Sequence, residues 1–394
     1  MSLPDTYTLT KQEALNSRRS VDYSTVQAVP EMWAIAAQRF GSVTALHDPH
    51  SNPVVDVTYA ELYQSIQQFA AGLQTLDIKP GEHIALFSDN TPRWLIADQG
   101  IMTAGAVDAV RGSQADPEEL LYILSHSDSI GLIVQNQDLL DKLAGGLKEI
   151  SLRFIILLTD EAPQNTLTAK TLNFSQLLEQ GANTPLQPVS FKRDSLATLM
   201  YTSGTSGRPK GVMLSHANLL SQIAAVCAVV HLTPGERVLS ILPIWHCYER
   251  TFEYFILSQG CTQAYTNIRQ VKKDLTDFKP HYMVGVPRLW ESIYEGVQKQ
   301  FREQPAGKQK LIRFFLAQSQ RYITAKRTWQ RLNLEKLKLS LLERIAAGLQ
   351  AILFWPLHFL GGKLVYQKVR AATGGNVRFV VSGGGSIADH LEDF

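Results

Sequence analysis

The chain has 394 residues, of which 45% are hydrophobic and 19% are charged, so it can bury a large core and bulk disorder is excluded. This length predicts two or three subdomains rather than one. The net charge is only +2, but residues 301–370 hold 14 Lys/Arg and 3 Asp/Glu, and this local charge of +11 favours an anionic partner for that segment.

The three cysteines, Cys227, Cys247 and Cys261, show no paired spacing with one another or with histidine. This pattern argues against a disulfide framework or a zinc site and favours a reducing compartment. Residues 1–25 are polar and are expected to be loosely ordered. They contain no apolar run of the kind found in a secretory signal, so the expected location is cytoplasmic.

From about residue 30 the sequence alternates between helical and strand-like patterns. Apolar residues at helical spacing predict helices over 58–76 and 92–107. Short apolar runs between turn residues predict buried strands over 83–88, 131–134 and 153–158. This alternation is typical of βαβ units around a mostly parallel sheet, so the predicted fold class is α/β.

The second half shows the same alternation of predicted strands and helices. Apolar runs predict four further strands, over 197–201, 237–243, 282–287 and 377–382. A helix is predicted over 215–230, with Ser215 as its N-cap. Residues 300–372 form a long insertion that is helical, basic and partly apolar.

The stretch MYTSGTSGRPKGV, residues 200–212, follows directly after one of these strands. Its glycines let backbone N–H groups converge on one point, its hydroxyls add donors, and Arg208 and Lys210 add positive charge, so it is suited to hold a phosphate. The P-loop pattern fails because Gly211 follows Lys210 and Pro209 bars a continuous helix. KGVML predicts a second strand instead, and a solvent-exposed hairpin turn is the alternative.

YTSGTSGRPKGVMLSHANL resembles the signature of the adenylate-forming superfamily, and the resemblance extends over nearly the whole chain from about residue 25. LPIWHCYER, VGVPRLWESIYEGVQ and VSGGGSIA resemble its long-chain fatty-acid branch. VDAVRGSQADPEEL is most similar to acyl-carrier-protein synthetases of cyanobacteria and plastids. The resemblance implies the large N-terminal domain of that fold, with mostly parallel sheets and helices in two subdomains.

The same resemblance implies how the domains are arranged. Residues 26–190 would form a first α/β subdomain and 191–299 a second one with the phosphate loop. The helical insertion would follow over 300–372, and 373–394 would return to the second subdomain. The family's later motifs and its small C-terminal domain with a catalytic lysine do not occur before Phe394. We therefore expect an incomplete large domain that is inactive alone.

The implied reaction is attack by a fatty carboxylate on the α-phosphate of ATP, which gives an acyl-adenylate and pyrophosphate. Lys210 would be a catalytic cation, and Thr202 would approach Mg²⁺. The residues implied to hold the β- and γ-phosphates are Thr202, Ser203, Gly204, Thr205, Ser206, Gly207 and Lys210. The acceptor thiol would belong to coenzyme A or to the phosphopantetheine of acyl carrier protein.

Two further segments match the family's acyl and adenylate pocket. His246 would be catalytic and would line the pocket, and Trp245 would gate the fatty-acid tunnel; a satisfied structural histidine is the alternative. Their match to the branch pattern implies that Glu249 and Arg250 form a structural ion pair near the pocket; a solvated helix start is the alternative. Ser382, Gly383, Gly384 and Gly385 follow a strand, and the resemblance implies that they contact the acyl group and adenine. A simple tight turn is the alternative for these glycines.

The insertion leaves several partners open. Gln350, Pro356 and His358 interrupt its apolar stretch over 346–362, which argues against a membrane-spanning helix. It could pack as an ordinary helical insertion, contact a membrane peripherally, or dock an acidic acyl carrier protein. No nucleic-acid partner is expected. A plant protein of this kind would lie in the plastid stroma. The alternatives to fatty-acid activation are a ligase for another carboxylate and a non-catalytic fragment that binds fatty acid or membrane.

Overall fold

The computed structural model describes residues 10–164, 167–202, 207–333 and 338–392. Contacts between Cα atoms divide the chain into two compact units, Met1–Asn267 and Ile268–Phe394. The first unit holds most of the β-structure, and the second is mainly helical. Both units alternate strands with helices, as the sequence predicted for an α/β protein.

A seven-stranded sheet forms the larger core of the first unit, in the order β7-β6-β5-β3-β4-β8-β9. Every neighbouring pair is parallel except β8 and β9, which are antiparallel. The strands are β3 (His83–Phe87), β4 (Val107–Arg111), β5 (Ser129–Val134), β6 (Phe154–Leu157), β7 (Lys170–Asn173), β8 (Leu196–Thr202) and β9 (Lys210–Ser215). The parallel strands therefore end at one common edge of the sheet.

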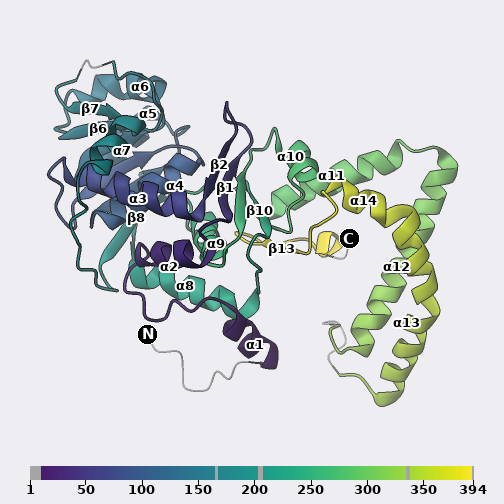
Figure 1. Ribbon diagram of the computed structural model, residues 1–394. Coiled ribbons are helices and arrows are strands. Elements are labelled where there is room, and N and C mark those ends of the chain that lie inside the picture. Colours follow the sequence, from purple (N-terminus) through teal and green to yellow (C-terminus); the bar gives the residue numbers. More distant parts are fainter. Residues whose placement is uncertain (1–9, 165–166, 203–206, 334–337, 393–394) are drawn as a thin grey trace. The chain divides into compact units, whose positions relative to one another are not determined.

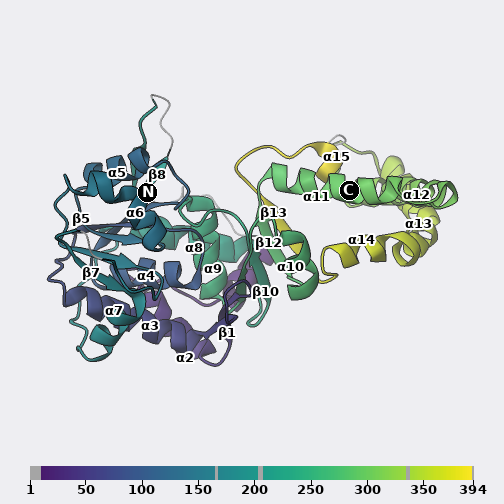
Figure 2. The ribbon, with the colours of Figure 1, turned by 90° about the horizontal axis from the view of Figure 1, so that it is seen from above.

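Helices cover both faces of this sheet (Figure 2). Alternate residues of β3 to β6, such as Ala85, Phe87 and Leu132, form one core with α5 and α6. On the other face, α3 packs closely on α4 and α7, because Gly100 leaves room for the Phe69 ring and Gly72 for Leu177. The helices are α3 (Tyr59–Gln74), α4 (Pro92–Thr103), α5 (Pro117–His126), α6 (Gln137–Leu147) and α7 (Phe174–Ala182).

The first unit also contributes four strands to a second sheet, in the order β10-β11-β1-β2. Only β1 and β2 pair antiparallel. The strands are β1 (Thr44–Asp48), β2 (Val55–Thr58), β10 (Arg237–Ser240) and β11 (Thr262–Tyr265), and the accompanying helices are α2 (Glu31–Phe40), α8 (His216–Val229) and α9 (Cys247–Ser258). Ser215 caps α8 through the amide of Asn218, as predicted.

The polar N-terminal segment contains a helix that the sequence did not predict, α1 (Lys11–Arg19). Thr10 and Glu13 form a reciprocal capping box at its start. The Asn16 amide donates to the carbonyl of Ala228 at the end of α8, at 3.1 Å. A local cap and a contact distant in sequence thus hold a segment that composition alone suggested to be loosely ordered.

The second unit pairs β12 (Tyr282–Gly285) with β13 (Phe379–Ser382) in parallel. Two long antiparallel helices, α12 (Ala306–Trp329) and α13 (Leu341–Gly361), pack side by side as a hairpin (Figure 1). The π-helix Gly362–Tyr366 and α14 (Gln367–Ala372) continue α13, so one helical run extends from Leu341 to Ala371 through Pro356. The remaining helices are α10 (Val271–Phe278), α11 (Pro287–Arg302) and α15 (Asp389–Glu392).

Candidate functional site

The glycine-rich loop connects the two antiparallel strands at one side of the seven-stranded sheet. Thr202 ends β8 and pairs with Lys210, which begins β9, so the prediction of a second strand after the loop is confirmed. Both residues are exposed. Gly207 has φ of +85°, which favours glycine. The predicted phosphate ligands Ser203, Gly204, Thr205 and Ser206 lie outside the described residues.

Aromatic side chains fix the root of this loop to α5. The Tyr201 hydroxyl and His126 Nδ1 lie 2.8 Å apart, and the Arg208 guanidinium lies 6.0 Å from the centre of the Tyr122 ring. Gly211 packs on the Tyr201 ring, because a Cβ there would lie 3.1 Å from it. Arg208, which the sequence suggested as a source of positive charge, thus contacts an aromatic face, whereas Lys210 projects into solvent.

Trp245 lies at the same sheet edge as the loop. A Cβ on Gly112 would lie 2.4 Å from the indole ring, so only glycine at 112 lets the ring pack on the backbone just after β4. Val110 of β4 pairs with Met200 of β8, and two residues further on this register brings Gly112 level with Thr202. The structure therefore brings the indole and Thr202, the residue at which the glycine-rich loop begins, to the carboxyl ends of adjacent strands, where α/β proteins commonly bind ligands.

His246 is exposed beside Trp245 and acts as the N-cap of α9. Its Nδ1 lies 3.9 Å from Cys247 Sγ, and the interaction with that thiol raises the pKa of His246, while burial and the Arg111 charge oppose the rise. Asn90 positions the preceding segment, since its amide donates to Leu242 O at 2.7 Å and accepts from Ile244 N at 3.0 Å. Sequence reasoning missed Asn90, because its partners are about 150 residues away.

The expected ion pair between Glu249 and Arg250 is wrong. Arg250 is fully buried and instead pairs with Asp98 of α4 and with Asp108 of β4, the latter at 2.5 Å. The same guanidinium donates to Thr198 Oγ1 of β8 at 2.7 Å and to the Tyr254 hydroxyl at 2.8 Å. We call these residues, Asp98, Asp108, Thr198, Arg250 and Tyr254, the Arg250 cluster. It joins α4 and α9 to β4, which Gly112 follows, and to β8, which ends at Thr202.

Glu249 makes a different contact, because it points away from Arg250 towards β10. The Ser240 hydroxyl donates to its carboxylate at 2.5 Å, and Glu253, one turn further along α9, accepts from the Tyr265 hydroxyl at 3.1 Å. Both carboxyls are fully buried, and burial raises the pKa of each to about 8. Both carboxyls bond to side chains inside the fold, and neither lies at the sheet edge that carries the glycine-rich loop. We therefore assign both a structural role.

In the second unit, the predicted SGGG segment leaves β13 and passes over the start of α11. Gly383 N donates to Gly285 O at 3.1 Å, and Gly384 has φ of +76°. A Cβ on Gly384 would lie 3.5 Å from Val286, so the positive φ rather than crowding favours glycine here. The Ser382 hydroxyl is buried and has no hydrogen-bond partner in the described part of the chain.

No group of three or more His, Cys, Asp or Glu side chains suited to a metal ion occurs in residues 10–392 outside the undescribed gaps. The predicted metal ligand, Thr202, offers one exposed hydroxyl at the end of β8. Mg²⁺ commonly takes one or two protein ligands and completes its shell with phosphate oxygens and water. Thr202 beside a phosphate loop fits an ion that is carried by a nucleotide.

The chain is similar to known proteins in sequence and in fold. The family model described as AMP-binding enzyme matches residues 33–394. The Arabidopsis thaliana long-chain-fatty-acid–[acyl-carrier-protein] ligase AEE15, chloroplastic, is 39% identical over 389 residues, which cover 93% of this chain and 53% of that relative. The Mycobacterium tuberculosis long-chain-fatty-acid–CoA ligase FadD15 is 29% identical over 86% of this chain and 53% of its own. The chain thus spans about half the length of these relatives.

Solved structures show the same fold at low sequence identity. The adenylation domain of the carboxylate reductase GR01_22995 from Mycobacterium chelonae matches with a TM-score of 0.70 at 16% identity, over 98% of this chain and 58% of that one. The inhibitor-bound N-terminal domain of FACL13 from Mycobacterium tuberculosis matches with a TM-score of 0.60 at 17% identity, over 93% and 72%. The family match, supported by this fold, establishes that the chain belongs to the AMP-binding enzyme family.

Proposed function

We propose that this chain forms part of a ligase that activates long-chain fatty acids with ATP. The observation that carries the proposal is the paired root of the glycine-rich loop, where Thr202 lies opposite Lys210 and level with Trp245 on Gly112. This places donors and a cation beside an apolar ring, as a substrate with an anionic and a hydrocarbon end would need. The printed names of AEE15 and FadD15 both specify long-chain fatty acids.

In the proposed reaction, a carboxylate oxygen of the fatty acid attacks the α-phosphorus of ATP. The bond from that phosphorus to the pyrophosphate oxygen breaks, which yields acyl-adenylate and pyrophosphate. A thiolate then attacks the acyl carbon, and AMP leaves with the electron pair of the broken C–O bond. The acceptor is coenzyme A or the phosphopantetheine of acyl carrier protein, since the relatives' names include both.

The loop would act on the leaving pyrophosphate. Its glycine amides and hydroxyls, from Thr202 to Gly207, would hold the β- and γ-phosphates, and Lys210 would offset the charge that develops as the bond breaks. Thr202 would hold Mg²⁺, and this ion would neutralise part of the triphosphate charge. The cation–π contact of Arg208 with Tyr122 anchors one side of the loop, and Lys210 is exposed to solvent at the other.

In the first unit, Trp245 and His246 would contact the acyl group. For Ser382 to Gly385 of the second unit we keep the role that the family resemblance implies, contact with the acyl group and adenine. The indole rests on a bare glycine backbone, so it could swing away without leaving a side chain unpacked beneath it. This supports a gate for the hydrocarbon tail. His246, at the exposed start of α9, would line the adenylate side. We place the activity in the cytoplasm, or in the stroma for a plastid protein.

A pair of lysine variants tests the nucleotide part of this proposal. Lys210→Ala should weaken binding of Mg·ATP by at least about tenfold, because it removes a charge-assisted contact to phosphate. Lys192→Ala is the matched control, since Lys192 is also exposed but precedes the opposite end of β8. Isothermal titration calorimetry of the 394-residue chain measures both. Equal ATP affinities for the two variants would contradict the proposed role of the loop.

A further inference from the structure

The α12–α13 hairpin of the second unit exposes an unusually apolar helix face. Ten large apolar side chains between Leu341 and Leu364 are exposed, from 45% for Leu360 to 79% for Leu342. We call these residues the α13 stripe: Leu341, Leu342, Ile345, Leu349, Ile352, Leu353, Trp355, Phe359, Leu360 and Leu364. Soluble proteins seldom leave so many large side chains together in water, so the stripe marks a binding surface.

The opposite face of α13 is the one that packs inside the hairpin. Ala347 and Ala351 are buried between the helices, and His358 Nδ1 lies 2.6 Å from the Ser319 hydroxyl of α12. The small residues therefore face α12, while the leucines and isoleucines face outward. This is the reverse of an amphipathic helix that simply covers its own domain. Only 17% of the most apolar 18 residues of the run Leu341–Ala371 is buried.

Cations border the stripe. Arg344 precedes its uncharged stretch and donates to Trp329 O at 3.0 Å, and Lys363 follows it with its ammonium 4.9 Å from the centre of the Phe359 ring. No Asp, Glu, Lys or Arg lies between these two residues. The tip of the hairpin adds Lys326 beside Tyr322. Glu343 lies next to Arg344, so the excess of positive charge lies at the Lys363 end and along α12. An apolar stripe beside these cations complements a surface that has hydrocarbon beneath anionic groups.

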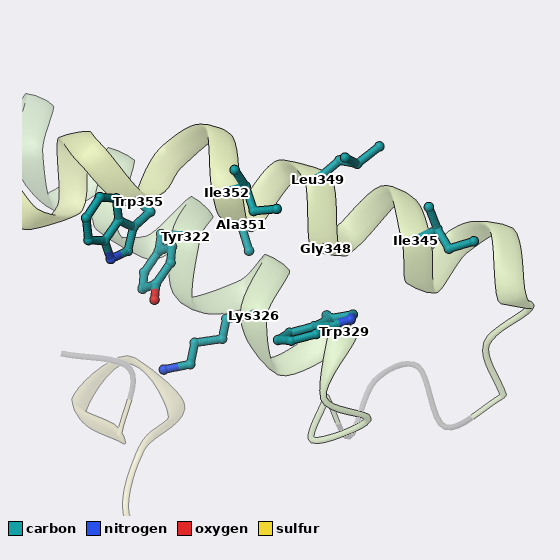
Figure 3. Close-up of a pocket in the computed structure, with 9 residues that line it drawn as sticks. All are labelled: Tyr322, Lys326, Trp329, Ile345, Gly348, Leu349, Ala351, Ile352 and Trp355. Atoms are coloured by element: carbon teal, nitrogen blue, oxygen red, sulfur yellow. The ribbon is translucent and has the colours of Figure 1, made fainter.

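A groove between the two helices continues this surface (Figure 3). Its volume is about 570 Å³, and its lining includes Lys326 and Trp329 from α12 and Leu349, Ile352 and Trp355 from α13. Tryptophan and lysine are the side chains that commonly lie at the boundary between headgroups and acyl chains. Trp355 is 53% exposed and Trp329 48% exposed, so both indoles are accessible from outside.

We propose that the α13 stripe inserts into the surface of an anionic lipid bilayer, with the helix lying in the plane of the interface. The run is long and apolar enough to cross a membrane by itself. However, α12 packs along it and carries Lys308, Lys310, Arg313, Arg321, Lys326 and Arg327 with no acidic residue. A spanning α13 would draw these cations into hydrocarbon, whereas an interfacial helix leaves them among headgroups and water. The inference does not depend on the proposed ligase activity.

An acidic carrier protein fits the surface less well. Basic side chains alone would suit it, but it would have to cover ten exposed apolar side chains as well, and bilayer insertion buries them without any matching partner surface. A second copy of this chain could also cover the stripe. Both occupants are outcomes of the experiment below.

The test is flotation of the 394-residue chain with vesicles of phosphatidylcholine alone or with 30 mol % phosphatidylglycerol, a composition chosen to give an anionic surface. We expect association with the anionic vesicles. The triple variant Leu349→Gln, Ile352→Gln, Leu353→Gln should lower the partition coefficient by at least tenfold. Val229→Gln with Ile268→Gln is the matched control, because these exposed apolar residues lie outside the hairpin and should leave binding unchanged.

The contribution of charge to vesicle binding and the depth of insertion into the bilayer are measured separately. Lys326→Glu with Lys363→Glu should lower binding to anionic vesicles by at least tenfold and leave the weaker binding to neutral vesicles unchanged. Brominated lipids should quench tryptophan fluorescence more strongly with bromine near the headgroup than near the bilayer centre, and Trp329→Phe with Trp355→Phe should remove most of this quenching. Stronger quenching from the bilayer centre would overturn the in-plane arrangement.

Four results would overturn the proposal as a whole. The first is no vesicle association by the unmodified chain. The second is association that the triple variant retains. The third is a dimer in light scattering that the triple variant converts to monomer without any vesicle binding, which would assign the stripe to a second copy. Binding of an acidic acyl carrier protein in place of vesicles would likewise assign the surface to that partner.

Discussion

The first unit of this chain buries a cluster of charged side chains, whereas the second exposes a row of apolar ones. The first buries the Arg250 cluster completely, with a guanidinium and two carboxylates at 0% exposure. The second leaves the α13 stripe in solvent, with Leu342 79% exposed. The buried charges have partners within the unit, whereas the described residues cover the stripe only in part, for example where Trp355 stacks on Phe359. The first pattern is typical of a protein core whose charged groups are paired. The second is typical of a surface that binds a partner.

Replacing Arg250 should have the largest effect on the stability of the first unit. Arg250→Met leaves Asp98 and Asp108 buried without a counter-ion, and we expect a loss of about 3–5 kcal/mol in the free energy of unfolding. Arg313→Met is the control, because Arg313 is exposed and its side chain bonds only to Gln309 in the described structure. Urea unfolding followed by circular dichroism measures both. Equal losses for the two variants would show that the cluster contributes nothing special.

The buried carboxyls of α9 give a pH-dependent test of the same interior. Glu249 and Glu253 have pKa values near 8 in the fold, against 4.5 for an ordinary glutamate. Between about pH 5 and 8 the folded chain keeps protons that the unfolded chain has lost, so the free energy of unfolding falls as pH rises, by up to about 1.4 kcal/mol per pH unit for each carboxyl. Glu249→Gln with Glu253→Gln should flatten this fall.

The matched control for this titration is Glu149→Gln, which changes an exposed carboxyl of the first unit. It should keep the slope of the unmodified chain. Denaturant midpoints at pH 5, 6, 7 and 8 give both slopes. A double variant as steep as the unmodified chain would show that the two buried carboxyls are not the groups that titrate.

The smallest effect is expected on the α13 stripe. In the absence of lipid, Leu353→Ala should change the free energy of unfolding by no more than about 0.5 kcal/mol, because its side chain is 69% exposed. The same change at the fully buried Leu132 should cost about 2–5 kcal/mol. Thermal unfolding of the two variants compares them. A loss at Leu353 close to that at Leu132 would mean that the stripe is covered within the chain.

Sequence periodicity predicted most strands of both units and the helices of the hairpin, because these depend on local patterns of apolar residues. It failed at β4, whose residues Val107–Arg111 were partly assigned to the preceding helix. Asp108 interrupts the apolar run there, and a buried carboxylate cannot be told from an exposed one until its partner is known. That partner, Arg250, is 142 residues further along the chain.

The candidate site shows the same division. The strand after Lys210 followed from Pro209 and Gly211, which are local signals. The place of Trp245 did not, because it depends on Gly112 and on the pairing of β4 with β8. Pro356 was expected to interrupt the apolar helix, yet helix continues through it to Ala371, held by packing of α13 on α12. Contacts distant in sequence therefore decided what local rules could not.

The contact between Gly112 and Trp245 has a consequence for how this fold can vary. A Cβ at position 112 and the present indole position exclude each other, because the two would lie 2.4 Å apart. A side chain at 112 and the indole at 245 thus compete for the same space, so the two residues are expected to change together. A sequence that gains a side chain at 112 must give up the tryptophan or its orientation at 245 in the same step. The size of residue 112 then decides whether an indole can lie against the backbone that follows β4.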